Sequence, residues 1–296
     1  MRLESAFKEA KVNFEKQVPL ARYTTFRIGG PADYLLCPES PEALAKAVSL
    51  LEEEGVSYFP LGGGSNLLVR DGGFRGAVLS LSGLKKFFCE GDLVRAEAGV
   101  FLPSLLSFCV EKGLSGLEFL AGVPATVGGA VVMNAGAFGQ EIKDVLEGIL
   151  ICRGEELEFL ERKRLSISYR ALSLPPASVV VSATFRLNPS SPSEVKARIS
   201  SFLAQRREKQ PLSYPSAGSI FKNPPEAAAG YLIEAAGLKG MRRGGAEISR
   251  KHANFIVNTG KARAEDVLYL MEFAKERVFR EFGIILEEEV RIVGEG

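Results

Sequence analysis

The sequence predicts an α+β protein built from two or three domains. The chain has 296 residues, which is more than a single hydrophobic core usually serves. Strand-like apolar runs alternate with helical patterns in its first half, and several short strands then follow one another over residues 146–187. A Pro- and Ser-rich stretch, residues 188–193, divides these strands from a further region of mixed helices and strands.

The composition is that of an ordinary globular protein. Hydrophobic residues make up 46% of the chain and charged residues 25%. A net charge of +1 gives no reason to expect nucleic acid or a membrane surface as a partner. No apolar run approaches the ~18 residues of a membrane span, and the first residues lack the apolar core of a signal peptide. We therefore expect a cytoplasmic protein.

Cysteine and histidine usage argues against a metal site. The four cysteines, Cys37, Cys89, Cys109 and Cys152, form no C-x-x-C pair, so we expect buried free thiols. His252 is the one histidine, which excludes a multi-histidine metal site. No G-x-S-x-G motif offers it a serine partner.

The first half of the chain predicts a β–α–β unit. Residues 1–21 read as an amphipathic helix followed by a connector. Ser40 is a typical N-cap before Pro41, and Gly55 ends the helix that follows. Its apolar face would consist of Leu44, Ala47, Val48 and Leu51. A buried strand over residues 56–61 then enters a glycine-rich turn, and a further strand covers residues 77–81.

The rest of the chain continues the alternation. Pro103 begins a helix that Gly113 ends, and a helix after Pro192 follows the predicted linker. The last helix begins near Glu265, with Val267, Met271, Ala274 and Val278 on its buried face. Strands are expected over residues 93–99, 146–153, 157–160, 179–187, 254–258 and 285–293, of which 179–187 is apolar enough to be central.

Two stretches of small residues are the strongest functional signals in the chain. Residues 62–66 read Gly-Gly-Gly-Ser-Asn, which suits either a tight turn or an anion-binding concavity of backbone amides. Leu67 stands where a dinucleotide fingerprint needs glycine, and no Walker lysine follows. Residues 121–137 form a second such stretch. Two small-residue loops suggest a long ligand lying against backbone at two places, as a flavin dinucleotide would.

Short motifs spread over nearly the whole chain resemble those of a known family. In chain order they are Thr25-Phe26-Arg27-Ile28-Gly29-Gly30, Gly62-Gly63-Gly64-Ser65-Asn66, Gly122-Val123-Pro124 with Thr126-Val127-Gly128-Gly129, Asn134-Ala135-Gly136, Tyr169-Arg170, Ala217-Gly218-Ser219, Phe221-Lys222-Asn223-Pro224, Leu238-Lys239-Gly240 and Glu289-Val290-Arg291. The set is similar to the UDP-N-acetylenolpyruvoylglucosamine reductases, flavoproteins of bacterial peptidoglycan synthesis. The short length resembles the subtype that lacks a tyrosine-bearing insertion.

This resemblance implies a two-subdomain FAD-binding fold of the vanillyl-alcohol-oxidase type with a C-terminal α/β substrate-binding domain. The implied domains are residues 1–82, with residues 284–296 returning to them, then 83–188 and 194–283. FAD would be bound non-covalently and reduced by NADPH. The substrate would be a UDP-sugar bearing an enolpyruvyl group, and the protein would act as a monomer.

The resemblance also assigns site residues. The implied FAD-binding residues are Gly62, Gly63, Gly64, Ser65, Asn66, Gly122, Pro124, Thr126, Gly128, Gly129, Asn134 and Ala135. The implied substrate-binding residues are Lys209, Asn223, Lys239 and His252. His252 stands where other members carry glutamine, and Leu172 stands where they usually carry serine.

Three further residues are implied to carry the chemistry. Hydride addition to an enolpyruvyl group pushes charge onto its carboxylate, and the planar, permanently charged fork of Arg170 suits that charge. Ser219 matches the family's proton donor. Glu289 matches its catalytic glutamate, which would orient or relay protons. Glu287 and Glu288 are its neighbours, and acids on a terminal strand also serve as edge protection.

Two other functions remain compatible with parts of the pattern. The chain could be another FAD-linked oxidase or reductase of the same fold, acting on small hydroxy acids or sugar lactones. It could also be a nucleotide-sugar binding protein without turnover. Such a protein would have no reason to keep Arg170, Ser219 and Glu289 together.

Overall fold

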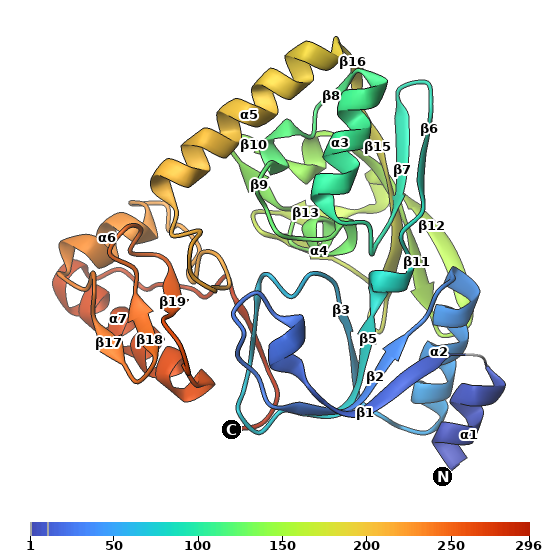
Figure 1. Cartoon of the computed structure of the whole chain (residues 1–296), viewed down its shortest axis with the longest axis horizontal. Coiled ribbons are helices and arrows are strands. Elements are labelled where there is room, and N and C mark those ends of the chain that lie inside the picture. The colour runs from blue at the N-terminus through green and yellow to red at the C-terminus, as the bar shows by residue number, and fades with distance from the viewer. Residues whose placement is uncertain (1, 11) are drawn as a thin grey trace. The chain divides into compact units, whose positions relative to one another are not determined.

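The computed structural model describes residues 2–10 and 12–296, which form two compact units from interleaved segments of chain (Figure 1). The first unit contains the described residues up to Lys16 together with Tyr34–Gly63 and Gly76–Gln205. The second unit contains Gln17–Asp33, Gly64–Arg75 and Arg206–Gly296. Each unit has its own cluster of buried apolar side chains.

A four-stranded sheet lies near the N-terminus. Its strands are β1 (Asn13–Pro19), β2 (Pro31–Cys37), β5 (Phe74–Ser80) and β3 (Tyr58–Leu61), in that order. Strands β3 and β5 are parallel. The connector expected after the helix α1 (Arg2–Glu9) is wrong over residues 13–19, because these residues form strand β1. Strand β3 is also less buried than expected, with Leu61 as its one buried residue.

Helix α2 (Pro41–Glu53) confirms the sequence prediction closely. The Ser40 hydroxyl accepts a hydrogen bond from the Ala43 amide at 3.2 Å, as an N-cap should. All of the predicted apolar face is buried, namely Leu44, Ala47, Val48 and Leu51.

A five-stranded antiparallel sheet dominates the first unit. Its order is β12 (Glu156–Glu161), β11 (Leu146–Arg153), β15 (Val179–Arg186), β7 (Leu93–Glu97) and β6 (Phe87–Glu90). Strand β15 is central, and its first five residues are buried, which confirms the prediction. Helix α3 (Leu102–Lys112) ends at Gly113 as predicted, with φ at +63°. The edge strand β6 was not expected.

The second small-residue stretch is not a loop throughout. Residues Val127–Val132 form helix α4, which contacts β15. Small residues also allow α4 to pack closely on the residue that follows β7, because a Cβ on Gly128 would lie 2.7 Å from Ala98 Cβ.

The predicted linker is partly strand. Residues Asn188–Pro189 form β16 and pair with β8 (Leu114–Ser115), so the chain is anchored where a free connection was expected. Helix α5 (Pro192–Lys209), yellow to orange in Figure 1, follows at once. The Ser191 hydroxyl accepts from the Glu194 amide at 3.2 Å. Val195 is buried, and Ile199, Phe202 and Leu203 pack against the first unit's core.

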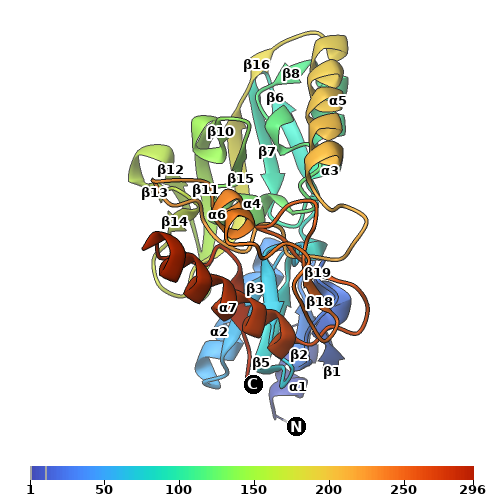
Figure 2. The same ribbon diagram turned by 90° about the vertical axis from the view of Figure 1, so that its left-hand side faces the viewer.

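The second unit contains a small antiparallel sheet with two helices. The strands are β17 (Arg242–Arg243), β18 (Ala246–Ile248) and β19 (Ile256–Asn258). The helices are α6 (Ala229–Ala235) and the longer α7 (Ala264–Phe282), dark red in Figure 2. The predicted apolar face of α7 is confirmed, because Val267, Met271, Ala274 and Val278 are buried.

Early segments of the chain are built into this second unit. Strand β20 (Arg291–Val293) pairs in parallel with β4 (Leu67–Val69). The Asn258 side chain donates to the Phe26 carbonyl at 3.1 Å. The Asp71 carboxylate accepts from the Ala264 and Glu265 amides at 3.0 and 3.1 Å, at the start of α7. The terminal strand expected over residues 285–293 is therefore confirmed only in its last three residues.

Other predictions from composition have mixed outcomes. All four cysteines are free, but only Cys109 and Cys152 are buried, while Cys37 and Cys89 are half-buried. Within the described chain, no helix has the length and apolar character needed to cross a membrane.

Candidate functional site

The first glycines of the Gly-rich turn pack against the second small-residue stretch. A Cβ on Gly62 would lie 2.4 Å from Thr126 Oγ1, and one on Gly63 would lie 2.9 Å from the Pro124 carbonyl oxygen. These residues all belong to the first unit. Glycine is required at both positions because the two stretches approach each other closely.

The remainder of the same turn belongs to the second unit. A Cβ on Gly64 would lie 2.0 Å from the Tyr23 carbonyl oxygen, and the Gly64 carbonyl accepts from the Thr25 amide at 3.1 Å. The Asn66 side chain donates to the Glu289 carbonyl at 2.9 Å. The glycines therefore have a packing role of their own, whatever ligand the turn binds.

Polar groups at these two stretches remain available for a ligand. Among residues 2–10 and 12–296, no hydrogen bond has the amide of Gly62, Gly63, Gly64 or Ser65 as its donor. Thr126 is 7% exposed, and its hydroxyl has no hydrogen-bond partner in the described chain. Buried polar groups are normally satisfied, so an unpartnered hydroxyl beside Gly62 of the same unit fits a phosphate-bearing cofactor such as FAD.

The start of helix α4 is less available than the sequence suggested. The Val127 amide donates to the Val100 carbonyl and the Gly128 amide to the Ala98 carbonyl, both at 2.9 Å. These first helical amides are thus used by the protein itself. Gly122, at φ +78°, and exposed Pro124 lie in the loop before the helix, and Gly129 is half-buried within it.

Asn134 is fully buried and its side chain is used within the first unit. Its Nδ2 donates to Glu141 Oε2 and to the Ser168 carbonyl, each at 3.1 Å. Its Oδ1 accepts from the Lys143 amide at 3.0 Å. The neighbouring Ala135 amide donates to the Ala130 carbonyl at 2.8 Å. Asn134 thereby joins the end of α4 to two hairpins.

One of those hairpins carries Arg170. Strands β13 (Ser166–Ser168) and β14 (Ala171–Ser173) pair so that Tyr169 and Arg170 form the two-residue turn. Arg170 has φ at +58°, a left-handed conformation that costs a non-glycine residue about 1–2 kcal/mol. Its guanidinium lies 5.0 Å from the centre of the Tyr169 ring. Backbone strain of this kind is concentrated at functional sites.

The other hairpin places a carboxylate near this arginine. It consists of β9 (Gly136–Ala137) and β10 (Gln140–Glu141). Burial raises the pKa of Glu141, but the Lys143 ammonium, the Asn134 amide and the nearby charge of Arg170 together hold that pKa below its usual value. A Cβ on Gly136 would lie 2.7 Å from Glu141 Cγ and 3.0 Å from Arg170 Nη1.

The second unit brings Ser219, Glu289 and Asn66 together. Gly218, with φ at +73°, turns the chain before Ser219. The next residue, Ile220, accepts from the Glu289 amide at 2.8 Å and from the Val290 amide at 3.3 Å through its carbonyl. The Asn66 side chain holds the Glu289 carbonyl, and the Thr25 hydroxyl donates to the Ser216 carbonyl at 2.7 Å.

The acids beside Glu289 have other partners. Glu287 forms an ion pair with Lys222 at 3.2 Å, and Glu288 forms one with Lys275. Burial raises the pKa of Glu288, but the Lys275 ammonium outweighs it and the pKa is lowered. Glu287 and Glu288 thus serve surface ion pairs, which separates them from the predicted role of Glu289.

The predicted substrate-binding residues lie at several places in the second unit. Asn223 Oδ1 accepts from the Ala229 amide at 3.0 Å, at the start of α6. Lys239 forms an ion pair with Glu234 at 2.6 Å. His252 Nδ1 accepts from the Asn254 amide at 3.3 Å, and burial with the nearby Lys239 charge lowers its pKa. Lys209 is exposed at the end of α5.

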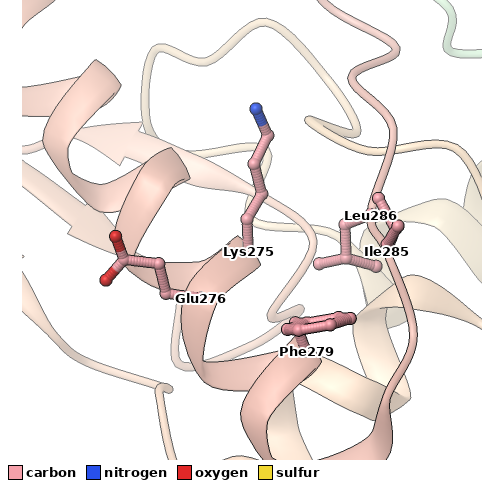
Figure 3. A pocket seen from close by; sticks show the side chains of 5 residues that line it. All are labelled: Lys275, Glu276, Phe279, Ile285 and Leu286. Carbon is pink, nitrogen blue, oxygen red and sulfur yellow. The ribbon is translucent and has the colours of Figure 1, made fainter.

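An apolar hollow also lies on the second unit. It is lined by Phe279, Ile285 and Leu286, with the stems of Lys275 and Glu276 beside them (Figure 3). None of the predicted site residues line it.

Sequence reasoning missed several residues that organise the candidate site. Thr25 and Gly136 stand inside motifs that were recognised without any role being assigned, and Glu141 stands outside them. Their roles depend on partners distant in sequence, such as Ser216 for Thr25. Within the sequence, their position in or near the recognised motifs is the only signal that could have identified them.

Two family models match the chain. Residues 32–155 match a model described as FAD binding domain, and residues 210–293 match one described as the C-terminal domain of UDP-N-acetylenolpyruvoylglucosamine reductase. A curated UDP-N-acetylenolpyruvoylglucosamine reductase from Syntrophus aciditrophicus is 51% identical over 94% of this chain and 91% of its own length.

Solved structures support the same relationship. The crystal structure of the reductase from Thermus caldophilus has a TM-score of 0.82 at 39% identity and covers 95% of this chain and 98% of its own. A glucooligosaccharide oxidase from Acremonium strictum, at 13% identity and a TM-score of 0.51 over 97% of this chain and 60% of its own, shares the fold alone. The predicted α+β FAD-binding fold is confirmed, and the chain belongs to the UDP-N-acetylenolpyruvoylglucosamine reductase family.

Proposed function

We propose that this chain reduces UDP-N-acetylenolpyruvoylglucosamine to UDP-N-acetylmuramate, with NADPH as the source of hydride. Family membership supports the reaction. The observation that carries it in this molecule is the pairing of the Ser219 bend with Glu289 through the Ile220 carbonyl. A hydroxyl and a carboxylate on adjacent, hydrogen-bonded backbone suit the transfer of one proton.

The residues of the two small-residue stretches would hold FAD. The amides of Gly62, Gly63, Gly64 and Ser65 and the hydroxyl of Thr126 are donors suited to its phosphates. When bound there, FAD would supply the chemistry of hydride transfer between NADPH and the enolpyruvyl substrate. Asn66, Gly122, Pro124, Gly128, Gly129 and Ala135 would shape the same binding surface, while Asn134 would act through its internal hydrogen bonds.

The three predicted catalytic residues would act on the enolpyruvyl group. Arg170 would pair with its carboxylate through two parallel hydrogen bonds and stabilise the charge that develops there. Ser219 would donate the proton that completes the lactyl ether. Glu289 would orient that hydroxyl or relay protons to it.

The remaining predicted residues would bind the nucleotide sugar. Lys209 and Lys239 carry charges suited to its phosphates, and Lys239 would exchange its present partner Glu234 for them. Asn223 has its amide nitrogen free of the helix cap that engages its oxygen. His252, whose pKa is lowered, would bind as a neutral hydrogen-bonding group.

Organisation and location follow from the same proposal. Residues 1–82 with 284–296, and residues 83–188, would form the FAD-binding part, and residues 194–283 the substrate-binding part. The protein would act as a monomer. Four free cysteines agree with the reducing environment of the cytoplasm, where we expect it to act.

Ser219→Ala tests this proposal most directly. Purified wild-type protein should carry FAD that NADPH bleaches under anaerobic conditions. In Ser219→Ala, bleaching should persist, while reoxidation by the enolpyruvyl substrate should slow by roughly 10²–10⁴-fold, the usual weight of a general acid. Ser213→Ala, an exposed serine in the same unit, is the matched control. Reoxidation of Ser219→Ala at the control rate would remove Ser219 as proton donor, and a protein that binds no FAD would reject the reaction itself.

A further inference from the structure

We propose that Asn134 and Glu141 are positioning residues that hold the guanidinium of Arg170 in its working orientation. Both were outside the predicted catalytic set, and Asn134 was expected to contact the cofactor instead. The inference rests on the proposed role of Arg170. It is carried by a network of contacts that lies wholly within the first unit.

Asn134 fixes the backbone of the turn that carries Arg170. Its Nδ2 donates to the carbonyl of Ser168, the last residue of β13 before the Tyr169–Arg170 turn. Its Oδ1 accepts from the Lys143 amide, which follows β10. Asn134 is fully buried and itself has φ at +39°, a conformation that asparagine tolerates. One rigid side chain therefore ties the arms of two hairpins.

Glu141 supplies the charge that faces the arginine. Its Oε2 accepts from Asn134 Nδ2, so its carboxylate is oriented by the same residue that holds the turn. The charge of Arg170 helps to lower the pKa of this carboxyl, which places the two groups within electrostatic reach. Lys143 pairs with the same Glu141 oxygen, so the Glu141 carboxylate faces two positive charges, those of Lys143 and Arg170.

Gly136 provides the space in which these two side chains meet. The point where a Cβ would stand on Gly136 is 2.7 Å from Glu141 Cγ and 3.0 Å from Arg170 Nη1. The same point is 2.8 Å from the Gln140 carbonyl oxygen, so a larger residue would have to displace the guanidinium, the carboxylate or the hairpin backbone. Gly136 does not have positive φ, so alanine is allowed there by backbone conformation and excluded by this contact.

Such a support matters because a guanidinium aimed at a developing carboxylate charge acts through geometry. A displacement of about 1 Å at a reacting centre can cost about 10²-fold in rate. Arg170 sits in a strained, half-buried turn whose other member, Tyr169, is exposed.

The first experiment separates the two half-reactions in Glu141→Gln and Asn134→Gly. Glutamine keeps the shape and the acceptor for Asn134 while removing the charge, and glycine at residue 134 keeps the left-handed backbone accessible. Anaerobic bleaching of the flavin by NADPH should be unchanged. Reoxidation by substrate should slow by about 10- to 100-fold. Glu158→Gln removes an exposed ion pair with Arg164 in the same unit and should leave both steps unchanged.

A double-mutant comparison then asks whether these residues act through Arg170. In an Arg170→Ala background, Glu141→Gln and Asn134→Gly should cause no further slowing, because the group they position is gone. Losses that multiply independently would overturn the proposal. If Arg170→Ala alone reoxidises at the wild-type rate, the role of Arg170 fails and this proposal fails with it. If Arg170→Ala is slow while both network variants are normal, only the positioning role is wrong.

A measurement that needs no substrate completes the test. Hydrogen exchange of the amides in residues 166–173 should accelerate in Asn134→Gly, while exchange in strand β15 should not change. Glu141→Gln, which keeps the Asn134 hydrogen bonds, should leave the exchange of this hairpin near the wild-type rate. Equal acceleration across the whole first unit would show general loss of stability and would overturn the specific support of the turn.

Discussion

The turn that carries Arg170 and the bend that carries Ser219 are held in different ways. Arg170 depends on side chains, because Asn134 and Glu141 fix its hairpin and face its charge. Ser219 and Glu289 depend on main chain, because two amides of the terminal segment converge on the Ile220 carbonyl. The first arrangement is sensitive to single substitutions at residues that do not react. The second should tolerate changes in neighbouring side chains as long as the backbone pairing survives.

The largest effect that would sharpen this comparison is expected for Arg170→Lys. Lysine keeps the positive charge but cannot make two parallel hydrogen bonds, and the surrounding network is shaped for a planar fork. Reoxidation of the reduced flavin by substrate should slow by roughly 10²–10³-fold, with NADPH reduction intact. Stopped-flow absorbance measures both steps. A variant that reoxidises normally would show that charge alone is needed and that the supporting hairpins are incidental.

A smaller effect is expected at the cofactor side of the first unit with Thr126→Val. Valine matches threonine in shape but lacks the hydroxyl, which has no partner among the described residues. FAD affinity should weaken by about tenfold, the weight of one hydrogen bond, measured by titration of apoprotein. The apoprotein should be no less stable to denaturant, because the lost group was buried and unsatisfied. Unchanged FAD affinity would mean that the hydroxyl does not face the cofactor.

The smallest expected effect is a difference in the pH windows of the two regions. Glu141 has a pKa held below 4.5, so its stabilisation is present above that value and is lost as pH falls through the lower, folded-state pKa. His252 has a pKa lowered from 6.5 in the folded protein. As pH falls, the unfolded chain therefore binds a proton at this residue at higher pH than the folded chain does, and stability falls below about pH 6.5. Between about pH 5 and about pH 7, the pH dependence of the free energy of unfolding in urea should therefore be reduced by His252→Gln and left unchanged by Glu141→Gln. The reverse response would contradict both assignments.

Much of the fold was predictable because its signals are local. Ser40 and Gly113 mark helix ends through side-chain capping and positive φ, and these act over a few residues. Strand β15 was predictable because it is buried along most of its length. Strands β1 and β6 were missed because they lie at sheet edges, where half-exposed residues carry no clear alternation.

The candidate site was predictable only as far as its motifs extend. Arg170, Ser219 and Glu289 stand in recognisable motifs. The residues that support Arg170 lie after helix α4 and in the β9–β10 hairpin, and no local pattern reveals that these segments meet the Arg170 turn. The triple glycine was compatible with either a tight structural turn or an anion-binding site. Gly62 and Gly63 leave room for residues 124–126, and Gly64 leaves room for the backbone of residues 23–24, so all three glycines also meet a packing requirement. Sequence spacing could not separate that requirement from ligand binding.

The interleaving of the two units governs the order in which the protein can mature. The second unit needs residues 17–33 and 64–75 together with everything after residue 205, so on the ribosome it stays incomplete until the last strand emerges. Until then, Phe26, Ile28 and Leu68, all buried in the finished protein, have no core to enter. A chain that loses its final residues would therefore leave early apolar segments exposed. Chaperones and proteases would then bind residues that are far in sequence from the truncated end.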